Sequence, residues 1–334
     1  RRFMTRVCVI HAGTHKTGTT SLQYFLQTNL DVLARSGLHF PRSGWYGVVP
    51  GQHAVAWELL KEEPGEQLRA LRDELAAVQG HAVLSSEEFS LFHDHPDRFA
   101  PLLAMLRDLG FTPRILLYVR AQAEFAESIY VEQIKHGSAR RLPDVLHEIW
   151  QDGTYRLDLR TIPFRYEQIV ERFEAMLGPG SVLVRPYARA GDTFAIFRDF
   201  LAALQLLAPG FVPPRDGLEL AHPRINESLT FGALLAYAFV HLHPEIGLPD
   251  DPTPFFSEHA ADVPPAWLNE RYALLSRDEC LRFVRVFDDE NRRLEARYGI
   301  AIPGARTGEI APDDAPLWER AQLERAVYDR LFDV

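Results

Sequence analysis

The sequence predicts an α/β fold in which helices cover both faces of a central parallel sheet, a three-layer α/β/α arrangement. Over the first two thirds of the chain, short apolar runs alternate with longer amphipathic segments. A loop rich in glycine, threonine and serine separates the first apolar run from the first amphipathic segment. Strands that are buried on both faces are continuously apolar, and helices connect parallel neighbours. The last third shows no further strand pattern and predicts a helical C-terminal extension.

Five segments have the composition of buried strands, since they are short, rich in aliphatic and β-branched residues and bounded by turn residues. They are residues 6–12, 38–41, 81–85, 113–120 and 181–187. The clearest is 113–120, which contains the uninterrupted apolar run from Ile115 to Val119. We expect this segment to be buried on both faces.

Apolar residues recur at helical spacing between these strands. In residues 20–36 the recurring positions are Leu22, Phe25, Leu26, Leu30 and Leu33. Gly37 follows in the position of a helix C-cap, so a single helix is expected here. The same periodicity predicts helices at 53–61, 65–78, 96–109, 122–135, 142–150, 166–177, 194–206, 226–241, 276–298 and 315–332.

The length of 334 residues fits one large domain or two small ones. We expect residues 1–210 to form the α/β core and residues 211–334 to form a helical part of the same domain. Residues 244–265 are rich in proline and aspartate and are long for a connection. Loops of this kind often cover a binding site, so this segment is the predicted lid.

The composition is that of an ordinary globular protein, with 46% hydrophobic and 25% charged residues. A formal net charge of −10 argues against a broad basic face for nucleic acid. The cysteines are Cys8 and Cys280, which build no disulfide framework or metal cluster and favour a reducing, cytoplasmic setting. The longest apolar segment, 229–242, is short against the ~20 residues that span a membrane, and no stretch of signal-peptide type precedes the first strand.

The most informative segment is the loop after the first predicted strand, where residues 7–23 read VCVIHAGTHKTGTTSLQ. Free amide groups at a helix start attract an anion. In a triphosphate-binding loop, a lysine follows the second glycine directly. Here Gly13 and Gly18 have that separation, but Thr19 follows Gly18 and the lysine is Lys16, two residues earlier. An ordinary strand-to-helix turn with a threonine cap is the alternative.

The segment KTGTTS at 16–21 resembles the 5′-phosphosulfate loop of sulfotransferases that use 3′-phosphoadenosine-5′-phosphosulfate, in the form found in bacterial members. The resemblance implies a P-loop-like fold and a donor site in which Lys16 stabilises charge on the leaving oxygen. The residues that it assigns to the 5′-phosphate are Thr17, Gly18, Thr19, Thr20 and Ser21. His15 is expected to shape the loop, and His11, at the end of the strand, is expected to be structural.

A second element of the resemblance is Arg120, which follows a buried strand, and Ser128, eight residues later. In sulfotransferases an arginine and a serine so placed hold the ribose 3′-phosphate, for which the planar guanidinium is suited. The alternative is a surface ion pair and a solvated serine. The third cofactor loop of the family has no clear match, and Arg224, with Asn226 and Ser228, is its expected substitute; a helix cap beside a surface arginine is the other possibility.

The catalytic base is expected where the strand 81–85 ends. In cytosolic sulfotransferases, a histidine after the corresponding strand removes the proton of the acceptor hydroxyl. Glu87 is the residue of this chain that corresponds best to that histidine, and a carboxylate can remove the same proton. An acidic residue that merely favours a helix dipole is the alternative for Glu87. His53 is the rival base, or a substrate contact, since it follows a loop on the expected acceptor side.

The expected reaction is sulfuryl transfer to an acceptor hydroxyl, with 3′-phosphoadenosine-5′-phosphate as product and no metal required. The acceptor is expected to be a saccharide or glycolipid, with a small alcohol or phenol next. Aromatic residues that could contact it are Phe40, Trp45, Tyr46, Phe255, Phe256 and Trp267. The alternatives are a kinase-like phosphoryl transferase and an inactive nucleotide-binding module. Neither a nucleic acid nor a membrane-spanning segment is expected.

Overall fold

The computed structural model describes residues 5–14, 16–62, 65–137, 140–157, 160–187, 194–219, 229–247, 272–310 and 315–332. The chain divides into two compact units. The first consists of Arg1–Arg120, Leu157–Ile225 and Glu290–Ile302, and the second of Ala121–Arg156, Asn226–Asp289 and Pro303–Val334. Each unit is therefore built from segments far apart in the sequence. The predicted division into residues 1–210 and 211–334 stays a prediction.

The first unit contains a five-stranded sheet in the order β2-β3-β1-β4-β7. Its strands are β1 (Arg6–His11), β2 (Leu38–His39), β3 (His81–Ser85), β4 (Phe111–Val119) and β7 (Val182–Pro186). All of the neighbouring pairs are parallel, with Ile10 of β1 opposite Leu84 of β3 and Ile115 of β4. The predicted α/β class and its central parallel sheet are thus confirmed.

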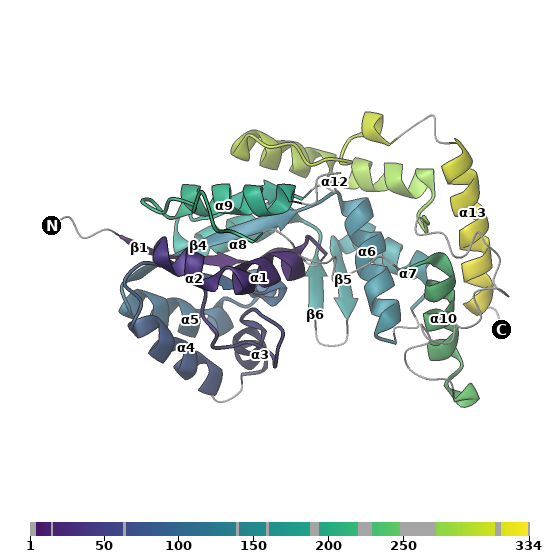
Figure 1. Ribbon diagram of the computed structural model, residues 1–334. Coiled ribbons are helices and arrows are strands. Elements are labelled where there is room, and N and C mark those ends of the chain that lie inside the picture. Colours follow the sequence, from purple (N-terminus) through teal and green to yellow (C-terminus); the bar gives the residue numbers. More distant parts are fainter. Residues whose placement is uncertain are drawn as a thin grey trace. The chain divides into compact units, whose positions relative to one another are not determined.

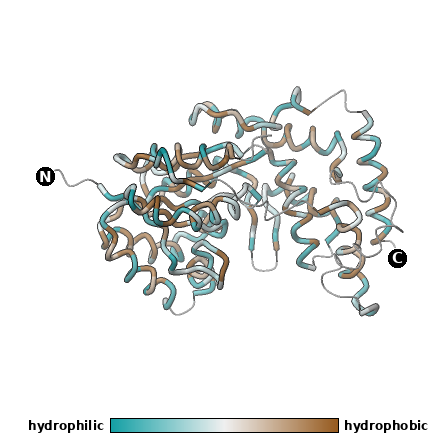
Figure 2. Tube along the Cα trace, in the orientation of Figure 1, coloured by the Kyte–Doolittle hydropathy of each residue, from teal (hydrophilic) through white to brown (hydrophobic). Residues whose placement is uncertain are grey.

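Helices cover both faces of this sheet (Figure 1). They are α1 (Thr19–Thr28), α2 (Leu30–Arg35), α3 (His53–Lys61), α4 (Glu66–Ala76), η1 (Glu87–Asp94), α5 (Pro96–Asp108), α8 (Tyr166–Leu177) and α9 (Ala195–Leu207). Val9 and Tyr118 pack with Phe25 of α1 and Phe200 of α9 on one face. On the other face, α5 and α8 contact β4. Figure 2 shows hydrophobic and hydrophilic stretches alternating along the helices, as expected of helices with one buried face.

The predicted single helix over 20–36 is wrong, because α1 and α2 are separated at Asn29. The side chain of Asn29 is buried and donates to the carbonyl of Phe25 at 2.8 Å and to that of Glu219 at 3.0 Å. Its oxygen accepts from the amide of Glu219 at 2.8 Å. Asparagine competes well for backbone groups and so interrupts helices. The hydrogen bonds with the distant Glu219 stabilise this interruption, and the local helical pattern gives no sign of them.

The second unit is mainly helical. Its helices are α6 (Gln122–Lys135), α7 (Leu142–Asp152), α10 (Phe231–Leu242), η2 (Pro244–Ile246), η5 (Thr307–Glu309), α13 (Ala315–Asp329) and η6 (Arg330–Phe332). The long helix α12 (Arg277–Tyr298) belongs to this unit up to Asp289 and to the first unit beyond it. The amide of Ser276 donates to Glu279 at 2.7 Å and the amide of Glu279 to the Ser276 hydroxyl at 3.3 Å, a capping box before α12.

A two-stranded sheet of β5 (Thr154–Leu157) and β6 (Arg160–Pro163) was not predicted from the sequence. Each strand has four residues, too few for a period of two to be distinguished from a loop. Of the predicted lid 244–265, the structure describes residues 244–247, where η2 lies, and the rest falls outside the described residues.

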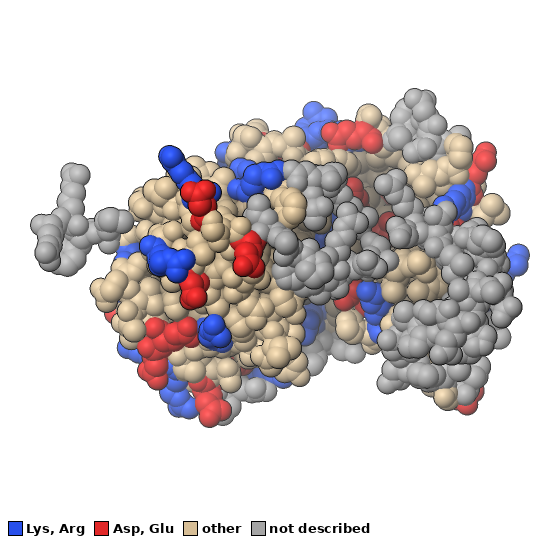
Figure 3. Space-filling view, viewed as in Figure 1, with Lys and Arg blue, Asp and Glu red and all other residues tan. Residues whose placement is uncertain are grey.

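Acidic and basic side chains are interspersed on the face of the molecule in Figure 3. Among the described residues, none of the helices combines the length and the apolar character needed to cross a membrane. Cys8 is buried and Cys280 is half-buried, and both are free thiols.

Candidate functional site

The loop that joins β1 to α1 leaves the sheet at its carboxyl edge. Because β1 lies between β3 and β4, the segments that follow these three strands meet at that edge, where ligands of open α/β sheets bind. The loop first runs along β4. The amide of Ala12 donates to Leu116 O at 2.9 Å, and the amide and hydroxyl of Thr14 donate to Tyr118 O at 3.2 Å and 3.0 Å.

The loop then turns sharply through two left-handed residues, Lys16 with φ 64° and Gly18 with φ 77°. Glycine adopts this conformation freely, but a residue with a Cβ is strained there by about 1 kcal/mol. The hydroxyl of Thr17 supports the turn by donating to Thr14 O at 2.5 Å. A lysine kept in a strained conformation at a helix start is the kind of outlier that points to a functional position.

The N-cap of α1 is Gly18, and no side chain caps the helix. The predicted alternative, a turn closed by a threonine cap, is therefore not what the loop forms. The hydroxyl of Thr19 is buried and has no hydrogen-bond partner among the described residues. A helix start with uncapped amides and a buried, unsatisfied hydroxyl is a site at which an anion would complete the hydrogen bonding.

Gly13 brings the two ends of the loop close together. A Cβ on Gly13 would lie 2.9 Å from Thr19 Oγ1 and 3.0 Å from both His11 Nε2 and Thr17 Oγ1. A Cβ on Gly18 would lie 3.1 Å from the ring of Tyr187. Gly13 is therefore required by close approach alone, whereas Gly18 is required by its left-handed conformation as well as by the approach of Tyr187.

Arg120 follows β4 directly and is buried. Its guanidinium donates to the carbonyl oxygen of Lys16 at 3.0 Å and lies 5.5 Å from the ring centroid of Tyr187. The carbonyl of Arg120 accepts from the hydroxyl of Tyr166 at 2.8 Å. Arg120 thus brings a permanent positive charge to the loop that carries Lys16. Tyr187 and Tyr166, which hold it, were not identified from the sequence as parts of the site.

Ser85, the last residue of β3, and Ser86, which follows it, bind different histidines. Ser85 Oγ lies 2.8 Å from Nδ1 of His11, and Ser86 Oγ lies 3.1 Å from Nδ1 of His53. The amide of Ser86 also donates to His11 O at 3.2 Å. His11 and His53 are both buried. The ends of β1 and β3 and the start of α3 therefore form one polar cluster.

The two predicted bases lie together in this cluster. His53 Nδ1 is 3.9 Å from Glu87 Oε2, and the side chain of Glu87 is 26% exposed against 8% for His53. Nε2 of His53 is buried without a partner among the described residues. The neighbouring carboxylate, Glu88, is buried and pairs with Arg160 at 2.7 Å. Of these two acidic residues, Glu87 is thus the one that solvent reaches more easily.

Gly51 and two glutamines hold the cluster in place. The side-chain oxygen of Gln52 accepts from the backbone N–H of Ser85 at 2.8 Å, and the backbone N–H of Gln52 donates to the carbonyl oxygen of Ser85 at 2.8 Å. A Cβ on Gly51 would lie 2.9 Å from both His53 Nε2 and Gln23 Nε2. The glycine lies directly before Gln52 and His53 in the sequence, which is the signal that could have marked it.

The imidazole of His11 is neutral over most of the pH range. Burial lowers the pKa of His11 from 6.5 to about 4, although the nearby Glu87 carboxylate raises it in part. The neutral ring packs edge-on against Tyr118 and Phe200, with centroid distances of 5.6 Å and 5.3 Å. The ring therefore has aromatic neighbours on two sides, and its Nδ1 contacts the hydroxyl of Ser85.

The remaining predicted site residues are placed as follows. Thr17 is buried, whereas Thr20 and Ser21, in the first turn of α1, are half-buried. Ser128 is a half-buried residue of α6 in the second unit, and its predicted pairing with Arg120 stays a prediction. His15, Arg224, Asn226 and Ser228 lie outside the described residues, as do Phe255, Phe256 and Trp267.

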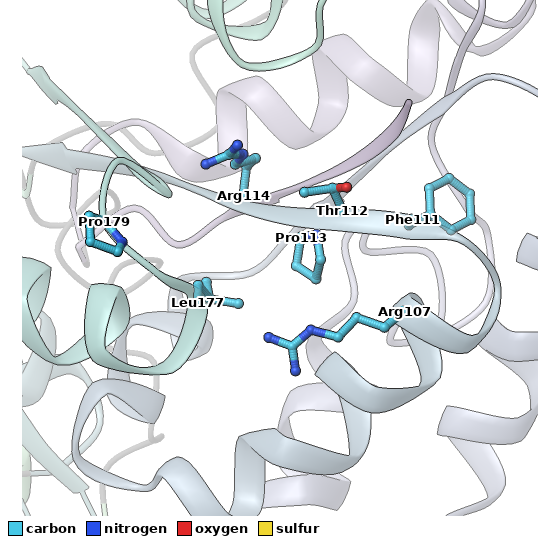
Figure 4. A pocket seen from close by; sticks show the side chains of 7 residues that line it. All are labelled: Arg107, Phe111, Thr112, Pro113, Arg114, Leu177 and Pro179. Carbon is cyan, nitrogen blue, oxygen red and sulfur yellow. The ribbon is translucent and has the colours of Figure 1, made fainter. Parts of the chain in front are cut away.

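A cavity of about 270 Å³ lies at the opposite end of β4 (Figure 4). It is lined by Arg107, Phe111, Thr112, Pro113, Arg114, Leu177 and Pro179. The strand residues among these belong to the amino end of β4, whereas Arg120 follows the carboxyl end. This cavity is therefore not part of the candidate site.

The residues that the structure describes include no group of three or more histidine, cysteine, aspartate or glutamate side chains that could hold a metal ion. Of the described residues of the loop and its contacts, Lys16 and Arg120 carry a permanent positive charge.

Comparisons with known proteins give one structural likeness. No family model matches the chain, and a search of curated proteins finds no significant match. Among solved structures, the chain is similar to a sulfotransferase from Alicyclobacillus acidocaldarius, with 18% sequence identity and a TM-score of 0.39. The alignment covers 73% of this chain and 97% of that one. A likeness at this level does not identify a function, which must come from the residues of the site.

Acid is expected to destabilise the protein through His11. The unfolded chain binds this proton near pH 6.5 and the native chain near pH 4, so stability falls as the pH drops through that window. The difference corresponds to about 3 kcal/mol of unfolding free energy. Urea denaturation of the wild type and His11→Asn between about pH 7 and pH 4 should show a weaker pH dependence in the variant.

Glu74→Gln is the matched control for this window. Burial raises the pKa of Glu74, but the hydrogen bonds from His39 and Ser43 outweigh it, and the pKa is lowered to about 2. Protonation of Glu74 therefore lowers the free energy of unfolding only below about pH 4.5. Equal pH dependence of the wild type and His11→Asn above that pH would contradict the assignment to His11.

Proposed function

We propose that this protein is a sulfotransferase that moves a sulfuryl group from 3′-phosphoadenosine-5′-phosphosulfate to an acceptor hydroxyl. The observation that carries the proposal is the position and conformation of Lys16. It precedes the N-cap glycine of α1 by two residues, has a left-handed backbone, and its carbonyl binds the buried Arg120. A cation in this position meets an anion at the helix start from the side of the loop, unlike the lysine of a triphosphate-binding loop.

The donor's 5′-phosphate fits the start of α1. The amides of Thr19, Thr20 and Ser21 follow the uncapped Gly18, and the hydroxyl of Thr19 is buried and needs a partner. The first intrahelical amide bond is that from Leu22 N to Gly18 O. The amides of Thr19 and Ser21 precede this bond at the start of the helix, where the helix dipole favours negative charge and an anion can accept from them.

The donor's 3′-phosphate is assigned to Arg120 and Ser128, as the sequence resemblance implies. Arg120 supports this role because it is buried, charged and placed at the carboxyl edge of the sheet. Arg224 and His15 are proposed as further donor contacts on the resemblance alone. A binding site that includes the 3′-phosphate would distinguish this donor from ATP, which lacks that group.

The reaction is an in-line displacement at sulfur. As the new bond from the acceptor oxygen to sulfur forms, the bond from sulfur to the 5′-phosphate oxygen breaks, and that oxygen keeps the electron pair. Lys16 and the loop amides stabilise the charge that develops there, as in phosphoryl transfer. Glu87 takes the proton of the acceptor hydroxyl, with His53 as the alternative base beside it at 3.9 Å.

The acceptor is proposed to be a saccharide or glycolipid hydroxyl, or that of a small alcohol or phenol. Tyr46 is 63% exposed, and its ring packs edge-on against Trp57 at 5.2 Å, which in turn lies 5.9 Å from the ring of His53. An exposed aromatic ring connected in this way to a candidate base suits the flat face of a sugar or phenol. Phe40 is buried and Trp45 packs on the core, so these two rings are structural.

Removal of the Lys16 ammonium is expected to reduce sulfate transfer by at least ~100-fold, the scale of losing a main charge-stabilising group. Transfer of radiolabelled sulfate to pooled acceptors, with mass spectrometry of the products, measures it in Lys16→Ala and Lys16→Gly. The glycine variant is expected to be more stable than the alanine variant by about 1 kcal/mol, since glycine accepts the left-handed backbone. Lys61→Ala, at the exposed end of α3, is the control; unchanged transfer without Lys16 would contradict the proposal.

Arg120→Ala is expected to weaken binding of 3′-phosphoadenosine-5′-phosphate by ~10-fold or more, because a charge-assisted contact to phosphate is lost. Isothermal titration calorimetry with adenosine 5′-phosphate separates this from damage to the loop, since that ligand lacks the 3′-phosphate. The variant should bind it about as well as the wild type does. If the bisphosphate binds equally to both proteins, Arg120 does not serve the 3′-phosphate.

Glu87→Gln is expected to lower kcat by ~100-fold or more without weakening donor binding, because the proton acceptor is lost while the shape is kept. His53→Asn keeps a group at the Nδ1 position and is expected to cost less. Glu88→Gln, next to Glu87 but paired with Arg160, is the matched control. Full turnover by Glu87→Gln together with loss in His53→Asn would assign the base to His53 instead.

A further inference from the structure

His11 is a buried side chain to which the proposed transfer assigns no role. It is the last residue of β1, directly before the loop, and none of its surface is exposed. Nδ1 lies 2.8 Å from Ser85 Oγ, whereas Nε2 is buried and has no hydrogen-bond partner among the described residues. Buried ring nitrogens in native proteins are normally satisfied, and one that is not requires an explanation.

Nε2 faces the inner side of the loop. A Cβ on Gly13 would lie 3.0 Å from His11 Nε2 and 2.9 Å from Thr19 Oγ1, so both atoms border the same small volume beside Gly13. They come from the end of β1 and from the first residue of α1. Thr19 Oγ1 is likewise buried without a partner among the described residues. Two unsatisfied polar groups that converge from separate elements on a helix start indicate a shared ligand.

We propose that His11 is a further residue of this anion site and that its Nε2–H donates a hydrogen bond to the anion held by the loop between β1 and α1. Within the proposed function, on which this inference rests, the anion is the phosphosulfate end of the donor. His11 is then a binding residue rather than the structural residue that the sequence suggested.

The neighbours of His11 make the required tautomer available. The backbone N–H of Ser85 donates to Gln52 Oε1, and the carbonyl of Ser85 accepts from the amide of Gln52, which leaves its hydroxyl proton for Nδ1 of His11. When the hydroxyl donates to Nδ1, the imidazole proton lies on Nε2, as an anion requires. A neutral donor also adds a hydrogen bond to the loop without another charge beside Lys16 and Arg120.

The test compares two substitutions of His11 that keep different nitrogens. His11→Asn retains a polar group near the position of Nδ1 and removes the Nε2 donor. His11→Gln reaches toward the position of Nε2. In titration calorimetry with 3′-phosphoadenosine-5′-phosphate, we expect His11→Asn to weaken binding by ~10-fold, as for a lost hydrogen bond to a charged group, and His11→Gln to recover most of the loss.

His81→Asn is the matched control. His81 is also a buried histidine whose Nδ1 binds a backbone amide, that of Val7 at 3.1 Å, but it begins β3 at the opposite end of the sheet. The His81→Asn variant should bind the bisphosphate with a dissociation constant within ~2-fold of that of the wild type, since residue 81 lies far from the charge of the ligand. Urea denaturation establishes that all three variants are folded at the temperature of the titration.

A second readout follows the ring itself. In wild-type protein labelled with ¹⁵N-histidine, the Nε2 resonance of His11 should move on addition of the bisphosphate, and inorganic sulfate serves as a simpler probe. If the wild type binds the bisphosphate and His11→Asn binds it equally, His11 is not a ligand and the proposed function stands. If only sulfate binds, and through His11, the anion site stands and the proposed donor is wrong. Binding of neither overturns both.

Discussion

The parallel pairing of β1 between β3 and β4 is the constraint on which the candidate site depends. This register places His11 opposite Ser85, with both at the carboxyl edge of the sheet. Ser86 follows β3 with an extended backbone, in which consecutive side chains point to opposite sides, so Ser85 and Ser86 bind different histidines, His11 and His53. A slip of one residue would turn His11 away from the loop and separate these pairs. The order of the strands thus brings the loop between β1 and α1 and the candidate base to the same edge of the sheet.

The loop itself is held against its own conformational preference. Lys16 remains left-handed, at a cost of about 1 kcal/mol, because its neighbours define its position. Its carbonyl is bound by Arg120, which is itself buried and held through its own carbonyl by Tyr166. The strain is therefore sustained by contacts from two other segments of the chain. A preorganised loop of this kind meets an anion with little further ordering, which favours tight binding and stabilisation of developing charge.

Much of the fold could be predicted from the sequence. Strands and helices with strong periodicity were predicted to within a few residues, and the predictions for α6 and α8 match their observed bounds. The local pattern failed at Asn29, where the contacts of a buried amide with Glu219 end α1. It failed again at β5 and β6, which are too short to show a period. In the first case distant contacts outweighed the local helical propensity, and in the second the strands were too short for a pattern to be recognised.

For the site, the sequence by itself determined the residue types: a loop with its lysine displaced before the second glycine, an arginine after the central strand, and a carboxylate and a histidine as candidate bases. The tertiary structure alone decided their relations. It joined Arg120 to the carbonyl of Lys16 and brought Glu87 to within 3.9 Å of His53. It also directed the unsatisfied nitrogen of His11 toward the loop. Spacing along a chain reports local geometry, whereas these contacts depend on strand order and register, which only the folded sheet defines.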